Sequence, residues 1–128
     1  NPHFYYNALS SIMVLAENGD NDTVAKMFRK LSLIIRYITD TGSTTVSLAD
    51  ELDYVQKYLY CMKVRYQSSL NYNIDVDESL LSEEVPKLLI KDRHYRWQYR
   101  CGACRIRIFR CCGYLPHHSV LSHGRSCR

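Results

Sequence analysis

The 128-residue chain lacks the features that would place it in a membrane. No apolar run approaches the roughly 20 residues that a membrane-spanning helix needs. The chain does not start with a basic stretch followed by an apolar one, so we expect no signal peptide in this sequence. It also starts without Met, so we expect a piece of a longer protein whose sensing or membrane segments lie upstream. The length suffices for one domain and at most one and a half.

Cysteine and basic residues are scarce over most of the chain and crowd its end. Residues 1–90 contain one cysteine, Cys61, and 8 basic against 12 acidic residues. Residues 91–128 contain the other five cysteines, four of the five histidines, and 9 basic residues against 1 acidic residue. The net charge of +4 therefore comes entirely from the tail. We interpret the chain as two unlike segments joined near Ile90 and Lys91.

Apolar periodicity predicts two helices before residue 40. Asn1 suits a helix cap, and Pro2 suits the first helical position because its missing N–H costs nothing there. The segment "ENGDND" at 17–22 separates the helices, with Gly19 past the end of the first and Asp22 as the expected cap of the second. "DTGSTT" at 40–45 ends the second. The expected apolar stripes are Phe4, Ala8, Leu9, Ile12 and Leu15, then Val24, Met27, Phe28, Leu31, Ile34, Ile35 and Ile38.

A third helix gives the strongest periodic signal. "SLAD" at 47–50 resembles a capping box in which Ser47 is the cap and Asp50 replaces the usual Glu. The steps of four and three that follow form a heptad seam, which calls for a partner helix from the same chain or from a second copy. The seam consists of Leu48, Leu52, Val55, Leu59, Met62 and Tyr66.

After Ser69 the period changes to two. Apolar and polar residues alternate over 70–77, which predicts a half-buried strand. "ESLLSEE" follows as a loop or short turn. "VPKLLI" at 85–90 predicts the start of another helix, with Pro86 near its first position.

The tail, residues 91–128, has no sustained period. "RIRIF" at 105–109 could form a short strand, and otherwise we expect disorder. A zinc module is one alternative, but its ligand pairs are too close together; the candidate ligands are Cys101, Cys104, Cys111, Cys112, His117, His118, His123 and Cys127. Basic charge beside Tyr95, Trp97 and Tyr99 offers nucleic-acid binding as a second alternative. The composition favours a third account, an out-of-frame or foreign segment.

His3 is the candidate reactive group. A neutral imidazole nitrogen is a competent nucleophile near neutral pH, and it can form a covalent phosphoryl adduct and pass it on. In the first turn of a helix His3 would be partly exposed, with Asn7 one turn further on the same face. The alternative is a surface histidine with no task.

Several blocks in order resemble one protein family. "NPHFYYN" at 1–7 resembles the phosphoacceptor motif N-P-H-F-[LFY]-[FY]-N of the LytS/YehU-type sensor histidine kinases. "LSLIIRYI" at 31–38 is similar to that family's L-S-x-x-[LI]-R-Y block. "VSLADELDYVQKYLYCMKVRY" at 46–66 is similar to its V-x-L-x-x-E-L-x-x-[IV]-x-x-Y-L-x-[IL]-x-x-x-R-[FY] helix. "LNYNIDVD" and "VPKLLI" match the opening of its ATP-binding domain, so the resemblance covers about residues 1–90.

The resemblance implies a dimeric bacterial sensor kinase on the cytoplasmic side of the membrane. ATP with Mg²⁺ would phosphorylate His3, and the phosphoryl group would pass to an aspartate of a response regulator, possibly of the LytTR type. The motif residues that would support His3 are Asn1, Pro2, Phe4, Asn7, Arg36, Tyr37 and Arg65. The aromatic residues Phe4, Tyr5 and Tyr6 would pack the helices around the phosphoacceptor.

Two departures limit what the resemblance implies. Phe4 stands where many other histidine kinases have an acidic residue, so the general base stays unassigned. After Ile90 the family continues with Q-P-[LI]-[VI]-E-N-A and glycine-rich segments that bind Mg²⁺ and ATP, whereas this chain reads "KDRHYRWQYRCG". We therefore expect this chain to bind neither ATP nor metal and not to phosphorylate itself.

These observations predict a mainly α-helical fold in three parts. Residues 1–68 form a helical hairpin for dimerisation and phosphoacceptance, 69–90 an incomplete start of the α/β ATP-binding domain, and 91–128 a disordered tail. We expect a soluble homodimer without nucleic acid, attached to a membrane only through segments upstream. The alternative function is a non-catalytic helical dimerisation module.

Overall fold

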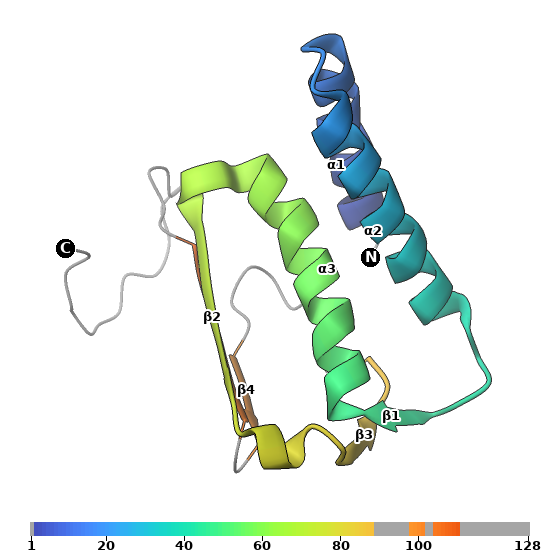
Figure 1. Cartoon of the computed structure of the whole chain (residues 1–128), viewed down its shortest axis with the longest axis vertical. Helices are drawn as coiled ribbons and strands as arrows, with labels where there is room; N and C mark the ends of the chain where they lie inside the picture. The colour runs from blue at the N-terminus through green and yellow to red at the C-terminus, as the bar shows by residue number, and fades with distance from the viewer. Residues whose placement is uncertain (1, 89–97, 102–103, 111–128) are drawn as a thin grey trace, which may run out of the picture.

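The computed structural model describes residues 2–88, 98–101 and 104–110, and this part of the chain is mainly helical, as predicted (Figure 1). The helices are α1 (Pro2–Glu17), α2 (Asn21–Thr39) and α3 (Leu48–Tyr66). The strands are β1 (Thr45–Ser47), β2 (Leu70–Val76), β3 (Glu84–Pro86), β4 (Gln98–Cys101) and β5 (Cys104–Arg110). Short 3₁₀ turns at Gln67–Ser69 and Glu78–Leu80 flank β2. None of the described helices is long and apolar enough to cross a membrane.

A tight turn makes α1 and α2 an antiparallel hairpin. Gly19 has a φ of +78°, which glycine adopts without a steric penalty, and its N–H donates to the carbonyl of Ala16 (3.1 Å). The N–H of Asp20 donates to the carbonyl of Leu15 (3.0 Å), which completes the helix end. The cap of α2 is Asp20, whose carboxylate accepts from the Thr23 N–H (3.1 Å). The prediction of Asp22 as cap was wrong because the turn at Gly19 is short enough for α2 to start at Asn21.

The start of α3 follows the predicted capping pattern. The Ser47 hydroxyl oxygen accepts from the Asp50 N–H (3.1 Å), and the hydroxyl donates to the Asp50 carboxylate (2.8 Å). At the other end, Gln67 leaves the helix with a φ of 49°, and its N–H donates to the Lys63 carbonyl.

The core lies between the three helices and β2. Its buried apolar side chains are Phe4, Ala8 and Ile12 from α1, Met27, Leu31 and Ile34 from α2, Leu48, Leu52, Val55, Tyr58, Leu59 and Cys61 from α3, and Leu70 from β2. Four residues of the α3 heptad seam, Leu48, Leu52, Val55 and Leu59, are therefore buried within the chain's own core, while Met62 and Tyr66 are partly buried. Three residues of the expected stripes, Leu9, Phe28 and Ile35, are instead 43–48% exposed.

A two-stranded sheet joins the segment before α3 to the segment after β2. β1 pairs antiparallel with β3, with Val46 opposite Val85. The N–H groups of Leu48 and Ala49 donate to the carbonyls of Glu83 and Leu81. The prediction of a helix starting in "VPKLLI" was wrong for 85–86, because a residue before proline is biased towards extended backbone and Val85 pairs as a strand. Ile90 lies outside the described residues.

A second, three-stranded sheet has the order β2-β5-β4, with both neighbouring pairs antiparallel. The strand predicted over 70–77 is confirmed as β2, which ends at Val76, and the strand expected at 105–109 is confirmed within β5. Disorder was expected elsewhere in 91–128, and this was wrong for 98–101, which pair in the sheet as β4, and for the two end residues of β5. The candidate zinc ligands from Cys111 onward and the aromatic residues Tyr95 and Trp97 lie outside the described residues.

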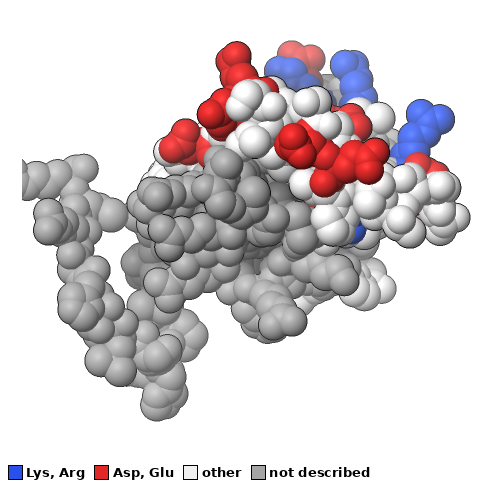
Figure 2. Space-filling model, turned by 90° about the horizontal axis from the view of Figure 1, so that it is seen from below, with Lys and Arg blue, Asp and Glu red and all other residues white. Residues whose placement is uncertain are grey.

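Acidic side chains gather on the end of the molecule that carries β1, β3 and the start of α3 (Figure 2). Exposed carboxylates on these elements and the adjoining loop belong to Asp50, Asp77, Glu78, Glu83 and Glu84. The acidic excess of residues 1–90 is thus visible as a surface property of this end.

Replacing Ser47 with alanine tests the local origin of α3. The variant loses the oxygen that accepts from the Asp50 N–H, so we expect its free energy of unfolding to fall by about 1 kcal/mol. Urea denaturation followed by circular dichroism measures the change. Ser82→Ala, at an exposed loop position, is the control and should shift the free energy by less than about 0.5 kcal/mol. Equal effects of the two substitutions would contradict the capping role of Ser47.

Candidate functional site

His3 lies in the first turn of α1 and its side chain is exposed. Pro2 is the first helical residue, as predicted, and Asn1 lies outside the described residues. The exposure agrees with the expectation of a partly exposed histidine at a helix start. An imidazole in this position can be reached by a large phosphoryl donor.

Phe4 anchors the turn that carries His3. Its side chain is 8% exposed, and its ring stacks on Tyr58 of α3 with centroids 4.2 Å apart and planes inclined by 22°. The Tyr5 ring meets Phe4 edge to face, with centroids 5.4 Å apart. Burial raises the pKa of the Tyr5 phenol. Successive helical residues point about 100° apart, so burying Phe4 turns His3 away from the core.

The other two motif residues of α1 differ in exposure. Tyr6 is 69% exposed, so the prediction that it packs the helices around the phosphoacceptor fails within this chain. Asn7 is half-buried one turn after His3, and its carbonyl accepts from the Ser11 hydroxyl (3.0 Å).

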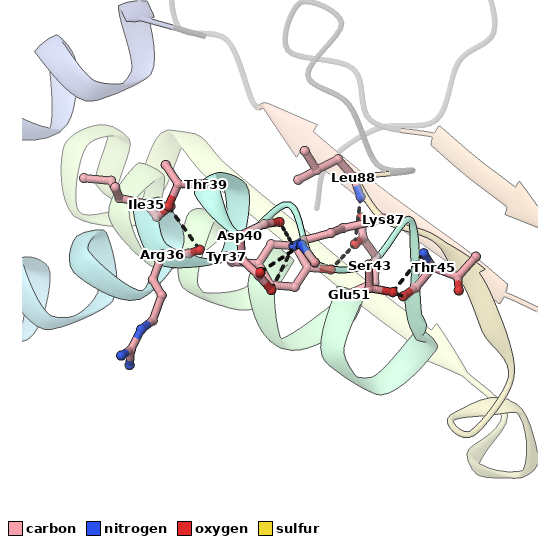
Figure 3. Close-up of polar contacts among 11 residues, drawn as sticks. Ile35, Arg36, Tyr37, Thr39, Asp40, Ser43, Thr45, Glu51, Lys87 and Leu88 are labelled. Carbon is pink, nitrogen blue, oxygen red and sulfur yellow. Dashed lines mark hydrogen bonds and ion pairs between the residues drawn. The ribbon is translucent and has the colours of Figure 1, made fainter.

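Arg36 and Tyr37 lie at the end of α2, and because α1 and α2 are antiparallel this is the end of the hairpin where α1 begins. The exposed Arg36 side chain points away from Tyr37 and Glu51 (Figure 3). The Arg36 carbonyl accepts from the Asp40 N–H. The Tyr37 ring stacks on Tyr54 of α3 with centroids 4.8 Å apart. Its hydroxyl donates to Glu51 (2.6 Å).

Glu51 was not selected from the sequence, although it is the Glu of the V-x-L-x-x-E-L pattern. Among the described residues it is the one buried polar or charged side chain, with 0% exposure. Its Oε2 accepts from the Tyr37 hydroxyl (2.6 Å) and from the Leu88 N–H (3.2 Å). Donors at these distances offset the cost of burying a polar group. One signal in the sequence could have indicated Glu51: it is an acidic residue within the helix that carries the apolar heptad seam.

Lys87 completes this polar cluster (Figure 3). Its Nζ lies 4.8 Å from the Tyr37 ring centroid and donates to the Asp40 carbonyl (2.5 Å). The ion pair with the Asp40 carboxylate is longer, at 3.5 Å. The N–H of Gly42 and the nearby Lys87 charge lower the pKa of Asp40. We call Tyr37, Glu51, Lys87 and Leu88 the junction cluster, because it joins α2, α3 and the residues after β3.

Arg65 lies apart from the junction cluster. It is in the last turn of α3, whereas Glu51 is in the first, so about 20 Å of helix separates them. The Arg65 guanidinium lies 5.4 Å from the centroid of the Tyr66 ring. The structure therefore gives Arg65 a local contact at the far end of α3.

The described residues contain no group of three or more His, Cys, Asp or Glu side chains that could hold a metal ion. Position 91, where the family's nucleotide motif would begin, lies outside the described residues.

The model of the family described as Histidine kinase matches residues 1–70 of this chain, which include all three helices. The chain belongs to this family. The resemblance drawn from the sequence motifs is thereby confirmed at the level of the family.

Curated relatives support the same assignment. Sensor histidine kinase YesM of Bacillus subtilis is 30% identical over 91 residues, and sensor histidine kinase BtsS of Escherichia coli is 33% identical over 91 residues. Each alignment covers 71% of this chain and 16% of the relative. Sensor protein LytS of Enterococcus faecalis is 32% identical over 92 residues, or 15% of its length. The chain thus spans about a sixth of these histidine kinases, and no solved structure matches it.

Removing the Tyr37 hydroxyl tests the junction cluster through its pH dependence. Burial, then the hydrogen bond to Glu51, raise the pKa of Tyr37 above its ordinary value of 10.0. A phenol whose pKa is higher in the folded than in the unfolded state stabilises the folded state. This contribution is fully present below about pH 10 and is lost as the pH rises further. We expect Tyr37→Phe to lower the free energy of unfolding by about 1–3 kcal/mol at pH 8, with the difference from wild type shrinking by pH 11.

Urea denaturation at pH 8, 9, 10 and 11 measures this difference. Tyr60→Phe is the control: burial also raises the pKa of Tyr60, but Tyr60 lies away from Glu51 on α3. A Tyr37→Phe effect that stays constant up to pH 11 would contradict the proposed origin of the pKa shift.

Proposed function

We propose that this chain carries the phosphoacceptor and dimerisation region of a two-component sensor histidine kinase, with His3 as the phosphorylated residue. The observation that carries the proposal is the exposed His3 side chain beside the buried Phe4 anchor. Family membership supports the reaction class. An imidazole nitrogen would attack the γ-phosphorus of ATP, the bond to the β-phosphate oxygen would break with release of ADP, and the ring proton would leave to solvent.

The second step returns the imidazole to its starting state. A carboxylate oxygen of a response-regulator aspartate would attack the phosphorus, the P–N bond would break, and the ring nitrogen would regain a proton. Both steps need an exposed histidine, because two large partners must reach it in turn. The exposure of His3 meets this requirement.

The nucleotide would be bound by another chain. The sequence after Ile90 lacks the Glu-Asn pair of the family's nucleotide motif. An intact kinase of the same family could phosphorylate His3 in trans within a mixed dimer. The intact parent would act on the cytoplasmic side of the bacterial membrane, with a response regulator of the LytTR type as its partner.

Two exposed apolar stripes support dimerisation. On α1 the stripe is Tyr6, Leu9 and Met13, which recur at helical spacing and are 48–69% exposed. On α2 it is Phe28 and Ile35, two turns apart and 48% and 43% exposed. The second candidate function, a non-catalytic dimerisation module, rests on these same stripes. Phosphate on His3 distinguishes the two functions.

Phosphotransfer in trans tests the role of His3 directly. Mixing this chain with an intact sensor kinase of the family and labelled ATP should place acid-labile label on the chain. His3→Gln should reduce that label at least about tenfold, because the nucleophile is gone, whereas His94→Gln, in the tail, should leave it unchanged. Label that survives His3→Gln would contradict the assignment, and absence of label on the wild type would favour the non-catalytic module.

A charge in the α2 stripe should weaken the dimer. Burying an unpaired carboxylate at an apolar interface is costly, so we expect Ile35→Glu to raise the dimer dissociation constant at least about tenfold. Sedimentation equilibrium measures it. Leu33→Glu is the matched control, because Leu33 is similarly exposed (45%) but points about 160° around the helix from Ile35. A monomeric wild type, or equal effects of both substitutions, would contradict the proposed interface.

A further inference from the structure

Four aromatic rings connect the turn that carries His3 to the junction cluster. The Phe4 ring stacks on Tyr58 with centroids 4.2 Å apart. Tyr58 meets Tyr54, one turn earlier on α3, at 6.5 Å and an inclination of 42°. Tyr54 in turn stacks on Tyr37 at 4.8 Å and 18°. The Tyr58–Tyr54 and Tyr54–Tyr37 separations lie within the usual range for interacting ring pairs, and the Phe4–Tyr58 pair is slightly closer. We call Phe4, Tyr58, Tyr54 and Tyr37 the aromatic row.

The far end of the row is held on two sides. The Tyr37 hydroxyl donates to the buried Glu51, and the Lys87 ammonium lies over the face of the Tyr37 ring (Figure 3). Tyr37 therefore cannot change its orientation without disturbing the contacts of Glu51 and Lys87.

Leu88 links this arrangement to the path of the backbone. Its φ of 57° is uncommon for a residue with a side chain, and its N–H donates to Glu51 (3.2 Å). Strained backbone of this kind persists only where surrounding contacts hold it. The contacts of Glu51 and Lys87 thus fix the direction in which the chain leaves β3, towards the position where this family has its nucleotide motif.

We propose that the aromatic row positions His3 by coupling the first turn of α1 to the junction cluster. Tyr54 and Tyr58 are positioning residues: they touch neither phosphate nor nucleotide, and act on His3 through Phe4. A change in the path of the chain at residues 87–88 would shift Tyr37, and the stacked rings would pass the shift to the turn that presents the imidazole. The inference rests on the proposed function and adds the residues that orient its nucleophile.

The two outer pairs of the row, Phe4 with Tyr58 and Tyr54 with Tyr37, are stacked, and stacked planes restrict rotation. The tilted contact between Tyr58 and Tyr54 joins these two pairs. Phe4 is one residue from His3, so a rotation of α1 that breaks its stack on Tyr58 turns the imidazole by the same angle. An aliphatic side chain at position 54 would still fill space, but it would not fix the plane of Tyr58. Removal of one ring in the middle of the row should therefore loosen the start of α1, although the substituted residue lies on α3.

The test removes the central ring and follows α1. Tyr54→Leu removes the ring, Tyr54→Phe retains it, and Tyr60→Leu is the matched control. Like Tyr54, Tyr60 is a half-buried tyrosine of α3, but it lies outside the row, and Lys30 lies over its ring at 4.8 Å. Amide hydrogen exchange in the full chain gives the rates at 6–8 of α1 and, as internal reference, at 24–28 of α2.

We expect Tyr54→Leu to raise the ratio of these two rates about three- to tenfold, and Tyr54→Phe and Tyr60→Leu to leave it unchanged. A merely structural role would accelerate both segments together and would not change the ratio. Tyr37→Leu, at the far end of the row, should give the same pattern and serves as the second variant if Tyr54→Leu does not fold. An unchanged ratio in the folded ring-removing variant would overturn the proposal.

Phosphotransfer from an intact kinase adds a second readout. Tyr54→Leu should lower kcat for labelling of His3 about three- to tenfold with KM unchanged, because docking surfaces remain while the nucleophile is less well oriented. If the wild-type chain takes no label, the proposed function fails, and the exchange ratio still decides whether the row couples the two ends. If wild type and Tyr54→Leu are labelled at the same kcat, the positioning role is refuted while the proposed function stands.

Discussion

The contact between the Phe4 and Tyr58 rings determines how the start of α1 is presented. Phe4 shares a helix face with Ala8 and Ile12, and burial of that face leaves His3 on the outside. The residue that follows His3 is thus the one that fixes the orientation of this turn. A catalytic acid at position 4 would be exposed only if α1 rotated, so in this chain position 4 serves packing and not acid–base chemistry.

The junction cluster imposes a second constraint, on how the helical hairpin is held against the rest of the chain. A carboxyl group with 0% exposure is costly unless donors surround it, and Glu51 obtains them from α2 and from the residues after β3. The hairpin of α1 and α2 is thereby tied to the β1–α3–β2–β3 segment through polar contacts as well as through the core. The apolar side chains Phe28 and Ile35 belong neither to the core nor to the junction cluster, so α2 keeps the exposed apolar stripe on which the proposed dimer interface rests.

Much of the secondary structure was predictable from the sequence, because local signals and tertiary contacts largely agree over residues 2–76. The apolar periods placed three helices, and Ser47 and Gly19 marked two of their ends. Asp20 was missed as a cap because two aspartates lie near the turn and only its geometry chooses between them. The strand at 84–86 was missed because Val85-Pro86 fits a helix start equally well in isolation, and only its pairing with β1 decides.

The position and exposure of His3 at the start of α1 were predictable, but the contacts around it were not. His3 and Phe4 follow from one motif, whereas Glu51 and Tyr58 gain their roles from residues up to about 50 positions away in sequence. The alternation around 105–109 indicated a strand, but nothing in the basic tail indicated that β4 would pair beside it. Long-range pairing of this kind has no local signature.

Nuclear Overhauser contacts between ring protons, combined with a soluble paramagnetic probe, test the central claim most directly. The account predicts strong cross-peaks between Phe4 and Tyr58 together with strong relaxation of the His3 ring protons by the probe. Absence of those cross-peaks, with His3 shielded from the probe, would contradict the presentation of the imidazole on which the account depends.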